Sequence, residues 1–361
     1  MPTTRIEVAA SAGAYPVIVG AGALATLPQL LESEGLGTQC LIVSSPIVWE
    51  LHGKRLARAL KVRQPILVPD GERSKTLQTV GRIYEALIKA RADRSAVIVA
   101  LGGGVIGDMV GFAAATYLRG VRLVQVPTTV MAQVDSAIGG KVGVNHALGK
   151  NLIGAFHPPR LVLADPLVLA TLPRREFRAG LYEVIKYGVI AAPSLLERMH
   201  TQRAAMFNHE PEALEPIVAE SCRIKADVVS RDERESGLRR TLNFGHTIGH
   251  ALEAVTDYRR FRHGEGVAYG MMAAAALGHH RGVTPQSTVD AINHIVTELG
   301  PLPPVSDLKA TEVLAATKRD KKVVSGTLHF VAAGEAGTTT ELTDVTDKDV
   351  RQALKAIGIR N

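Results

Sequence analysis

A buried strand that leads directly into a glycine run constrains the fold of this chain more than any other feature. Residues 96–101 read Ala-Val-Ile-Val-Ala-Leu, and Gly102-Gly103-Gly104 follow before a helical pattern begins. An uninterrupted apolar run of this length is typical of a parallel strand with helices on both faces. Glycines at such a turn let the backbone approach a phosphate group closely, and the next helix offers unpaired N–H groups. The pattern predicts a nucleotide-binding sheet.

Further segments of strand character are separated mostly by helical patterns. They are residues 5–9, 15–19, 41–43, 65–68 and 122–126. The first two flank a short turn and predict a hairpin. Residues 74–90 are predicted to be helical, with Ser74 as the N-cap. Strands that alternate with helices predict an α/β fold with a parallel, doubly wound sheet.

Helical periodicity dominates residues 173–299, and a short strand pair is predicted at 327–331 and 338–342. A chain of 361 residues is too long for one typical core. We therefore predict two domains. Residues 1–170 form the α/β nucleotide-binding domain, and residues 171–361 form a mainly α-helical domain that binds metal and substrate.

Composition excludes several classes of protein. No apolar run reaches the ~18 residues that span a bilayer, and the N-terminus lacks a signal-peptide pattern. The two cysteines, Cys40 and Cys222, cannot build a disulfide framework and are expected to be buried thiols, which favours a reducing cytoplasm. The net charge of +7 is scattered without interleaved aromatic residues, so we expect no nucleic-acid partner. The charge suits an anionic small substrate as well as it suits an ordinary surface.

Polar residues follow three consecutive strands. They lie in Asp70–Lys75, Gly102–Asp108 and Thr128–Thr129. Because doubly wound sheets bind ligands at the carboxyl ends of their strands, these segments predict a dinucleotide site, with NAD as the first choice. The glycine run is not the usual G-x-G-x-x-G fingerprint and is not a P-loop, so a tight structural turn is the alternative.

Three histidines predict a metal centre. His246 and His250 are four residues apart and share a helix face, and His263 follows a turn. Two imidazoles and a carboxylate make a catalytic zinc site with an open position, and cobalt suits the same ligands. Glu183 is the best candidate carboxylate because it lies on the apolar side of its helix, where a lone charge is costly. The alternatives are a surface pair of Glu183 with Lys186 and an ordinary helix histidine at position 250.

Further motifs occur in order along the chain: Gln133-Val134-Asp135-Ser136, Gly140-Lys141, Gly149-Lys150-Asn151, Glu183-Val184-Ile185-Lys186, Leu242-Asn243-Phe244-Gly245-His246, His263-Gly264-Glu265 and Asp320-Lys321-Lys322. With the motifs above, they resemble the 3-dehydroquinate synthase family of the sugar-phosphate cyclase superfamily along almost the whole chain. The resemblance implies a homodimeric enzyme of the shikimate pathway, which uses NAD and zinc or cobalt. Its anionic sugar-phosphate substrate is 3-deoxy-D-arabino-heptulosonate 7-phosphate.

The resemblance also implies roles for individual residues. The metal ligands would be Glu183, His246 and His263. The NAD contacts would be Asp70, Gly71, Glu72, Arg73, Ser74, Lys75, Gly104, Val105, Ile106, Gly107, Asp108, Thr128, Thr129, Lys141, Lys150, Val168, Leu169, Ala170 and Thr171. The substrate and catalytic residues would be Asp135, Lys141, Asn151, Lys186, Lys225, Arg239, Asn243, His250, Lys321 or Lys322, and Arg119, which would reach the partner subunit's phosphate pocket.

In this reading, His250 relays a proton, Lys225 and Arg239 hold a carboxylate, and Lys141 and Asn151 hold phosphate. One departure from the family pattern is Ser44-Ser45-Pro46, where relatives often carry an acidic residue or asparagine beside the adenosine ribose. Three alternatives are a cyclase for another sugar phosphate, a metal-dependent polyol dehydrogenase and an inactive NAD-binding sensor.

Overall fold

The computed structural model describes residues 3–36, 39–318, 323–324 and 327–360. They form two compact units. The first contains Met1–Pro173 and Asn208–Glu233, and the second contains Arg174–Phe207 and Arg234–Asn361. The predicted substrate lysines Lys321 and Lys322 lie outside the described residues.

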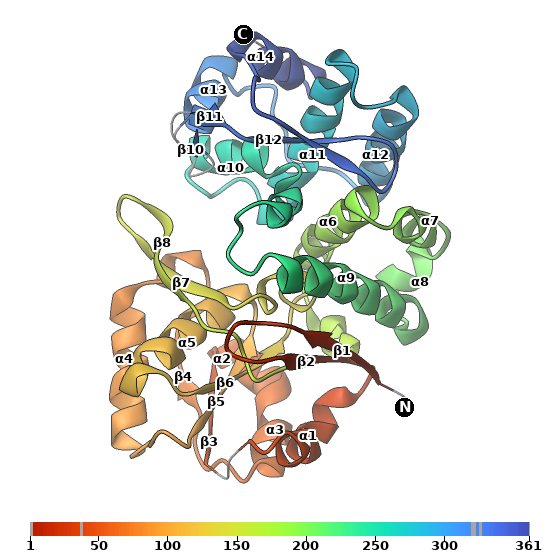
Figure 1. Ribbon diagram of the computed structural model, residues 1–361. Coiled ribbons are helices and arrows are strands. Elements are labelled where there is room, and N and C mark those ends of the chain that lie inside the picture. Colours follow the sequence, from red (N-terminus) through yellow and green to blue (C-terminus); the bar gives the residue numbers. More distant parts are fainter. Residues whose placement is uncertain (1–2, 37–38, 319–322, 325–326, 361) are drawn as a thin grey trace. The chain divides into compact units, whose positions relative to one another are not determined.

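A mostly parallel sheet organises the first unit (Figure 1). Within the described residues it has seven strands in the order β1-β2-β9-β6-β5-β3-β4. Their bounds are β1 Thr4–Val8, β2 Tyr15–Val19, β3 Cys40–Ser44, β4 Ile66–Leu67, β5 Val97–Gly102, β6 Arg122–Pro127 and β9 Leu161–Ala164. Only the β1–β2 hairpin pairs in antiparallel fashion within this sheet as described. The predicted doubly wound α/β fold is thereby confirmed.

Alternate residues of the central strands enter two separate cores. Ile98 and Ala100 of β5 pack with helices α4 and α5, whereas Val97, Val99 and Leu101 pack with α1 and α3. Both faces of the strand are therefore covered, which explains its unbroken apolar sequence. The helices and short turns of this layer are η1 Ala23–Thr26, α1 Leu27–Ser33, α2 Pro46–Val48, η2 Trp49–Gly53, α3 Lys54–Ala59, η3 Glu72–Ser74, α4 Leu77–Lys89, α5 Gly104–Thr116, η4 Tyr117–Arg119, η5 Ala132–Ser136 and η6 Pro166–Thr171.

The N-cap of α4 differs from the prediction. Ser74 ends the short turn η3, and the helix begins at Leu77 with Thr76 as its N-cap. The Thr76 hydroxyl accepts a hydrogen bond from the backbone N–H of Thr79 at 3.2 Å. Both residues are good caps, and the extra turn Glu72–Ser74, which Lys75 follows, shifts the start of the helix.

Two features of the first unit were not predicted. The hairpin of β7 (Lys141–His146) and β8 (Gly149–Phe156) packs on α5. Helix α9 (Pro211–Arg231) packs against β1, η5 and η6, although the division at 170/171 assigned it to the C-terminal domain. Its apolar residues, such as Ile217 and Val218, complete the core of the first unit, and a division by sequence position alone cannot show this.

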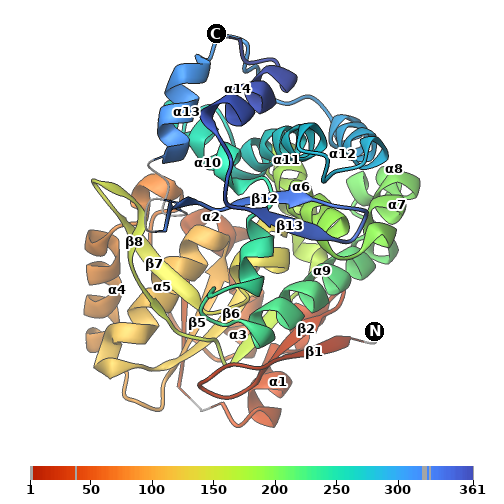
Figure 2. The ribbon, with the colours of Figure 1, turned by 45° about the horizontal axis from the view of Figure 1, so that its top comes forward.

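Helix α11 (His263–His280) is the centre of the second unit. It contacts α6 (Arg174–Ile190), α10 (His246–Val255), α12 (Gln286–Glu298) and α14 (Asp347–Ala356), as Figure 2 shows. The other elements are α7 Pro193–Thr201, α8 Arg203–Phe207, η7 Leu238–Asn243, α13 Ala310–Lys318 and the strands β10 Val323–Val324, β11 Thr327–Leu328, β12 Phe330–Ala333 and β13 Thr339–Leu342. The predicted C-terminal strand pair is present as β12 with β13, displaced by a few residues at its first strand. Of the helices described, none is both long and apolar enough for a membrane crossing.

Candidate functional site

The carboxyl ends of β3, β5 and β6 lie beside one another at one edge of the first unit's sheet. The chain passes from β3 outward to β4 and then returns to place β5 on the other side of β3. Parallel sheets bind ligands at such a change of direction. The glycine run at the end of β5 lies at this point.

The glycine run serves both packing and ligand access. Gly103 is the N-cap of α5 and has no side chain to accept hydrogen bonds from the first turn. The N–H groups of that turn are oriented to bind an anion such as a pyrophosphate. A Cβ on Gly104 would lie 2.8 Å from Ser136 Oγ, and one on Gly103 would lie 3.1 Å from Thr129 Cγ2. Close packing against two side chains therefore favours glycine at these positions even without a ligand.

Lys75 joins the segment after β4 to helix α5 and to the β7–β8 hairpin. Its ammonium group is buried and lies 2.5 Å from both Asp108 Oδ2 and Asn151 Oδ1. Burial raises the pKa of the Asp108 carboxyl, and the charge of Lys75 opposes that rise. Three residues predicted from separate motifs are thus in direct contact.

Asn145 extends this cluster and was not predicted. Its Nδ2 donates to Glu72 Oε1 at 2.8 Å, and its Oδ1 accepts from the backbone N–H of Asn151 at 2.9 Å. The ammonium group of Lys150 lies 3.9 Å from the same Glu72 oxygen. The only sequence signal for Asn145 was its place between the two motif lysines 141 and 150.

A second contact in the first unit depends on α9. The Lys225 ammonium, on that helix, forms an ion pair with the Asp135 carboxylate and donates to the Asp135 carbonyl oxygen at 2.6 Å. Asp135 lies in η5, 90 residues earlier in the chain. The structure therefore unites two predicted substrate residues that the sequence alone could not connect.

The remaining predicted residues of this unit are more dispersed. Thr128 is buried after β6, and the Thr129 hydroxyl accepts from the N–H of Ala132 at 3.1 Å. At Ser44 and Ser45, where the sequence departs from the family pattern, both hydroxyls have hydrogen-bond partners. Ser44 donates to the Leu101 carbonyl oxygen, and Ser45 caps α2. The other predicted positions are Asp70, exposed after β4; Lys141, exposed at the start of β7; Val168, Leu169, Ala170 and Thr171 in η6; and Arg119, exposed in η4 with φ of 67°.

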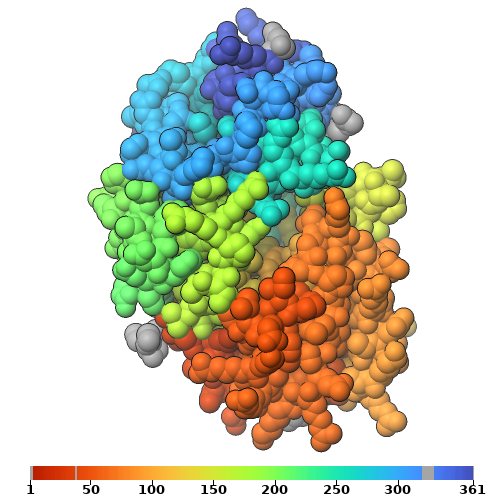
Figure 3. Space-filling view, turned by 180° about the vertical axis from the view of Figure 1, so that it is seen from behind, coloured from red at the N-terminus to blue at the C-terminus, as the bar shows by residue number. Residues whose placement is uncertain are grey.

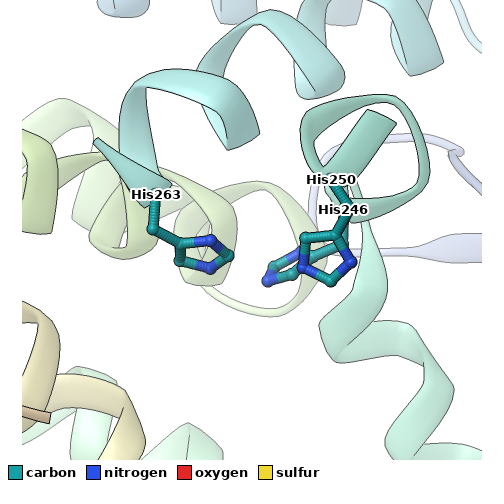
Figure 4. A group of neighbouring side chains, drawn as sticks. All are labelled: His246, His250 and His263. Atoms are coloured by element: carbon teal, nitrogen blue, oxygen red, sulfur yellow. The ribbon is translucent and has the colours of Figure 1, made fainter. Parts of the chain in front are cut away.

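Three imidazole rings cluster in the second unit (Figure 4). His246 and His250 project from one face of α10, and His263 projects from the first turn of α11. Their ring centroids are 5.3 to 5.6 Å apart, and one nitrogen from each ring lies within 4.8 Å of the others. Because the rings face one another from two helices, a single cation can be reached by more than one of them.

Glu183 lies at the base of this cluster on helix α6. Its Oε1 is 3.6 Å from Nε2 of His246 and 3.6 Å from Nε2 of His263. Zinc bonds to nitrogen and oxygen are ~2.1 Å long, so neighbouring atoms of a tetrahedral site are about 3.4 Å apart. Glu183 Oε1 therefore lies at almost the separation from each of the two nitrogens that a shared cation requires.

The environment of Glu183 also fits a cation. Its carboxylate is fully buried, and Oε1 accepts no hydrogen bond from the described residues. The Lys186 ammonium lies 2.5 Å from Oε2 as an ion pair, so the predicted pair exists but is buried rather than on the surface. Oε1 faces the imidazoles, and a buried carboxylate oxygen without hydrogen bonds is costly unless an ion compensates it.

Two acceptors orient the imidazoles. Nδ1 of His246 lies 3.1 Å from the Phe244 carbonyl oxygen, and Nδ1 of His263 lies 2.7 Å from Glu253 Oε1. Each acceptor favours the tautomer in which Nδ1 donates and Nε2 carries the lone pair. Glu253 was not predicted. Its signal was the spacing of His246, His250 and Glu253 at i, i+4 and i+7 on one helix face.

Glycines set the separation of the three helices that carry this cluster. A Cβ on Gly264 of α11 would overlap the Ala179 carbonyl oxygen of α6, and one on Gly270 would overlap the Gly245 carbonyl oxygen before α10. Gly249 and Gly266 also meet backbone to backbone, since a Cβ on either would lie 3.0 Å from the other's main chain. The histidines are therefore positioned by main-chain contact.

Glu265 anchors the start of α11. Its carboxylate is fully buried and accepts from Arg175 at 2.8 and 2.7 Å, with Arg178 3.8 Å away. It also accepts from the Arg262 N–H at 2.8 Å and so caps the helix. The third residue of the His263-Gly264-Glu265 motif therefore has a structural role.

Two other predicted residues lie in or beside η7, just before α10. Arg239 is buried there, and the Asn243 amide donates to Glu235 Oε1 at 2.7 Å. Both lie within seven residues of His246, so the segment that leads into α10 carries two of the residues that were predicted to contact the substrate.

Comparison with known proteins identifies the family. A model described as the N-terminal part of 3-dehydroquinate synthase matches residues 65–179, and one described as the C-terminal part matches residues 180–323. The chain belongs to the 3-dehydroquinate synthase family. It is 45% identical to the 3-dehydroquinate synthase of Nostoc punctiforme over 98% of this chain and 100% of the relative, and 45% identical to that of Synechococcus sp. over 99% of both.

Solved structures of cyclases share the fold. A 2-epi-5-epi-valiolone synthase from Streptomyces hygroscopicus, with NAD+ and Zn2+ bound, is 29% identical with a TM-score of 0.85 over 95% of this chain and 96% of that one. A 2-deoxy-scyllo-inosose synthase with carbaglucose-6-phosphate, NAD+ and Co2+ is 26% identical with a TM-score of 0.85 over 98% and 99%. The two parts of the family that match this chain meet between residues 179 and 180, within helix α6.

Proposed function

We propose that this protein is a 3-dehydroquinate synthase, which converts 3-deoxy-D-arabino-heptulosonate 7-phosphate to 3-dehydroquinate and phosphate. Family membership and 45% identity over nearly the full length of curated synthases support this activity. The structural observation that carries it is the convergence of Glu183 Oε1 on the Nε2 atoms of His246 and His263 at 3.6 Å. The reaction is a phosphate-eliminating cyclisation, so the enzyme is a carbon–oxygen lyase.

Two cofactors belong to the proposal. Glu183, His246 and His263 would hold Zn2+, with Co2+ as an alternative. The strand-end segments Asp70–Lys75 and Gly104–Asp108, with Thr128, Thr129, Lys141, Lys150 and Val168–Thr171, would bind NAD+. When bound, NAD+ supplies a transient oxidation of the sugar that is reversed within each turnover, and the cation supplies Lewis acidity at the sugar hydroxyls.

The residues of the chain would orient the substrate and move its protons. His250 would relay a proton near the oxidised carbon, because imidazole titrates near neutral pH and its ring lies in the ligand cluster. Lys225 and Arg239 would hold the carboxylate, with Asp135 and Asn243 as neighbouring polar contacts. Lys141, Asn151 and Lys321 or Lys322 would hold the phosphate. Their joint effect is orientation and charge stabilisation.

Lys186 would balance the charge of Glu183. The ammonium group lies 2.5 Å from Oε2 and also 4.8 Å from the centre of the Tyr187 ring. It holds one carboxylate oxygen while the other faces the imidazoles. Lys186 would therefore fix the rotamer of Glu183, and the family resemblance implies that it also contacts the substrate.

Location and assembly are part of the same proposal. Both cysteines are free thiols, Cys222 buried and Cys40 half-buried, which suits a reducing cytoplasm. A homodimer in which Arg119 reaches the phosphate of the partner subunit's substrate follows from the family resemblance. The exposed position of Arg119 in η4 is compatible with it.

One assay tests the function against its competitors. The purified protein is given the heptulosonate phosphate, NAD+ and Zn2+, and phosphate, carbocycle and absorbance at the NADH band are followed. We expect phosphate and 3-dehydroquinate in equal amounts with no net NADH. Stoichiometric NADH would instead indicate a dehydrogenase, and turnover of a sugar phosphate without a carboxylate would indicate a sister cyclase. Glu183→Gln should abolish turnover and metal binding, and its full activity would refute the ligand assignment.

A further inference from the structure

A second cluster of metal-ligating side chains lies on the surface of the second unit, on two helices that carry none of the residues of the first cluster. It comprises His200 on α7 with His294 and Glu298 on α12. One ligand atom from each residue lies within 4.8 Å of the others. Helices α7 and α12 pack together, and Figure 3 shows the green surface around α7 next to the blue surface of the C-terminal helices.

The geometry of the cluster is close to that of a three-ligand cation site. His294 and Glu298 are four residues apart and project from one face of α12. His294 Nε2 lies 3.5 Å from Glu298 Oε1, near the separation of about 3.4 Å between ligand atoms of tetrahedral zinc. This distance is too long for a good hydrogen bond but suits two atoms that share an ion.

The third ligand comes from a distant part of the chain. His200 Nδ1 lies 2.7 Å from Glu298 Oε2, and its ring centroid is 5.6 Å from that of His294. Both rings thus lie beside the same carboxylate, His200 at its Oε2 and His294 at its Oε1. A bound cation accounts for both rings.

We propose that His200, His294 and Glu298 form a second binding site for a divalent metal of the zinc class. Two imidazoles and one carboxylate match the ligand preference of Zn2+, Co2+ and Ni2+, with water in the open position. The side chains of His200 and His294 are 54% and 65% exposed, so the ion exchanges readily with solvent. Arg203 donates to the Glu298 carbonyl oxygen at 3.3 Å and places a positive charge nearby, which weakens this site relative to the buried one.

Binding would connect α7 to α12, whose ligands are 98 residues apart in sequence. The ion would replace the His200–Glu298 hydrogen bond with coordination bonds and add His294 to the connection. Because the site exists only in the folded unit, the metal stabilises that unit in proportion to its concentration. The site does not depend on the proposed catalytic function.

The test compares the full-length protein with His294→Gln and with His280→Gln, an exposed histidine on α11 as matched control. Each protein is stripped with a chelator and titrated with Zn2+ against a chromophoric competitor. We expect His294→Gln to bind one equivalent fewer than the other two proteins, whatever the occupancy of the buried site. When Co2+ replaces Zn2+, the d–d absorbance of the bound metal should be lower in His294→Gln than in the other two proteins, by the contribution of one Co2+ ion. Equal stoichiometry in all three proteins would overturn the proposal.

A second measurement uses stability. Added Zn2+ should raise the unfolding temperature of the wild type and of His280→Gln by more than that of His294→Gln. If Zn2+ shifts all three proteins equally, the cluster is a surface ion pair only.

Discussion

Nδ1 of His263 lies 2.7 Å from Oε1 of Glu253, a buried carboxylate on the neighbouring helix α10. This contact positions the imidazole without touching the proposed cation. It fixes which ring nitrogen faces Glu183 and increases the basicity of that nitrogen.

Glu253→Gln should therefore weaken metal binding while the three proposed ligands remain in place. We expect the affinity for Zn2+ to fall 10- to 100-fold, the range seen when partners of ligating histidines are removed. Chelator competition measures the affinity, and circular dichroism checks the fold. Glu233→Gln is the control, because that carboxylate belongs to the first unit and accepts from Ser11 N–H. Unchanged zinc affinity in Glu253→Gln would show that the contact does not orient His263.

Gly264→Ala should destabilise the protein strongly. The new methyl group would overlap the Ala179 carbonyl oxygen, and backbone cannot yield as a flexible side chain does. We expect a loss of about 3 kcal/mol in the free energy of unfolding. Gly81→Ala is the matched control on helix α4, where no atom lies within 4 Å of the added carbon, and it should be neutral or stabilising by up to about 1 kcal/mol. Urea unfolding of both variants decides whether the close approach is essential.

Lys75→Met should leave the Asp108 carboxylate partly buried without its ion pair. Because Asp108 retains some exposure, we expect a loss of about 2 kcal/mol rather than the full cost of a buried unpaired charge. The double variant Lys75→Met/Asp108→Asn should lose less than the sum of the two single variants. A double-mutant cycle by urea unfolding measures this coupling, and strict additivity would mean that the contact contributes nothing.

Cys222 should make stability depend on alkaline pH. Burial raises the pKa of its thiol to about 12, whereas the ordinary value is 9.0. The folded state therefore holds this proton more tightly than the unfolded state does. The stability that the protonated thiol contributes is fully present below pH 9 and is lost as the pH rises toward 12. Between these limits the wild type should lose about 1.4 kcal/mol per pH unit more than Cys222→Ala. Cys40→Ala is the comparison at a half-buried thiol, whose pKa burial also raises. Parallel pH profiles for wild type and Cys222→Ala would contradict the expectation.

Local sequence patterns predicted much of the fold. The strands at 97–102 and 122–127 were recognisable because helices cover both faces, so that β5 has no polar residue and β6 has only Arg122 and Gln125. The β7–β8 hairpin was missed because glycines and polar residues interrupt it. The assignment of α9 was missed because amphipathic periodicity shows that a helix has an apolar face but not which core that face enters.

The candidate site was predictable where its residues belong to compact motifs. His246, His250 and His263 could be grouped because they lie within 18 residues of one another. The contact of Lys225 with Asp135 and the cluster of His200 with His294 and Glu298 join residues about 90 or more positions apart. Such pairs are set by tertiary packing, which no spacing in the sequence records.

The crossing of α10 and α11 has a consequence for how this protein can change. The backbones of the two helices are in direct contact there. The distance between the turns that carry the imidazoles therefore does not depend on the size of any side chain. The outward-facing positions of both helices can accumulate substitutions while the cation geometry stays constant. We therefore expect many amino-acid substitutions on the solvent-facing sides of α10 and α11. Almost none should be tolerated at four glycines: Gly245, Gly249, Gly266 and Gly270.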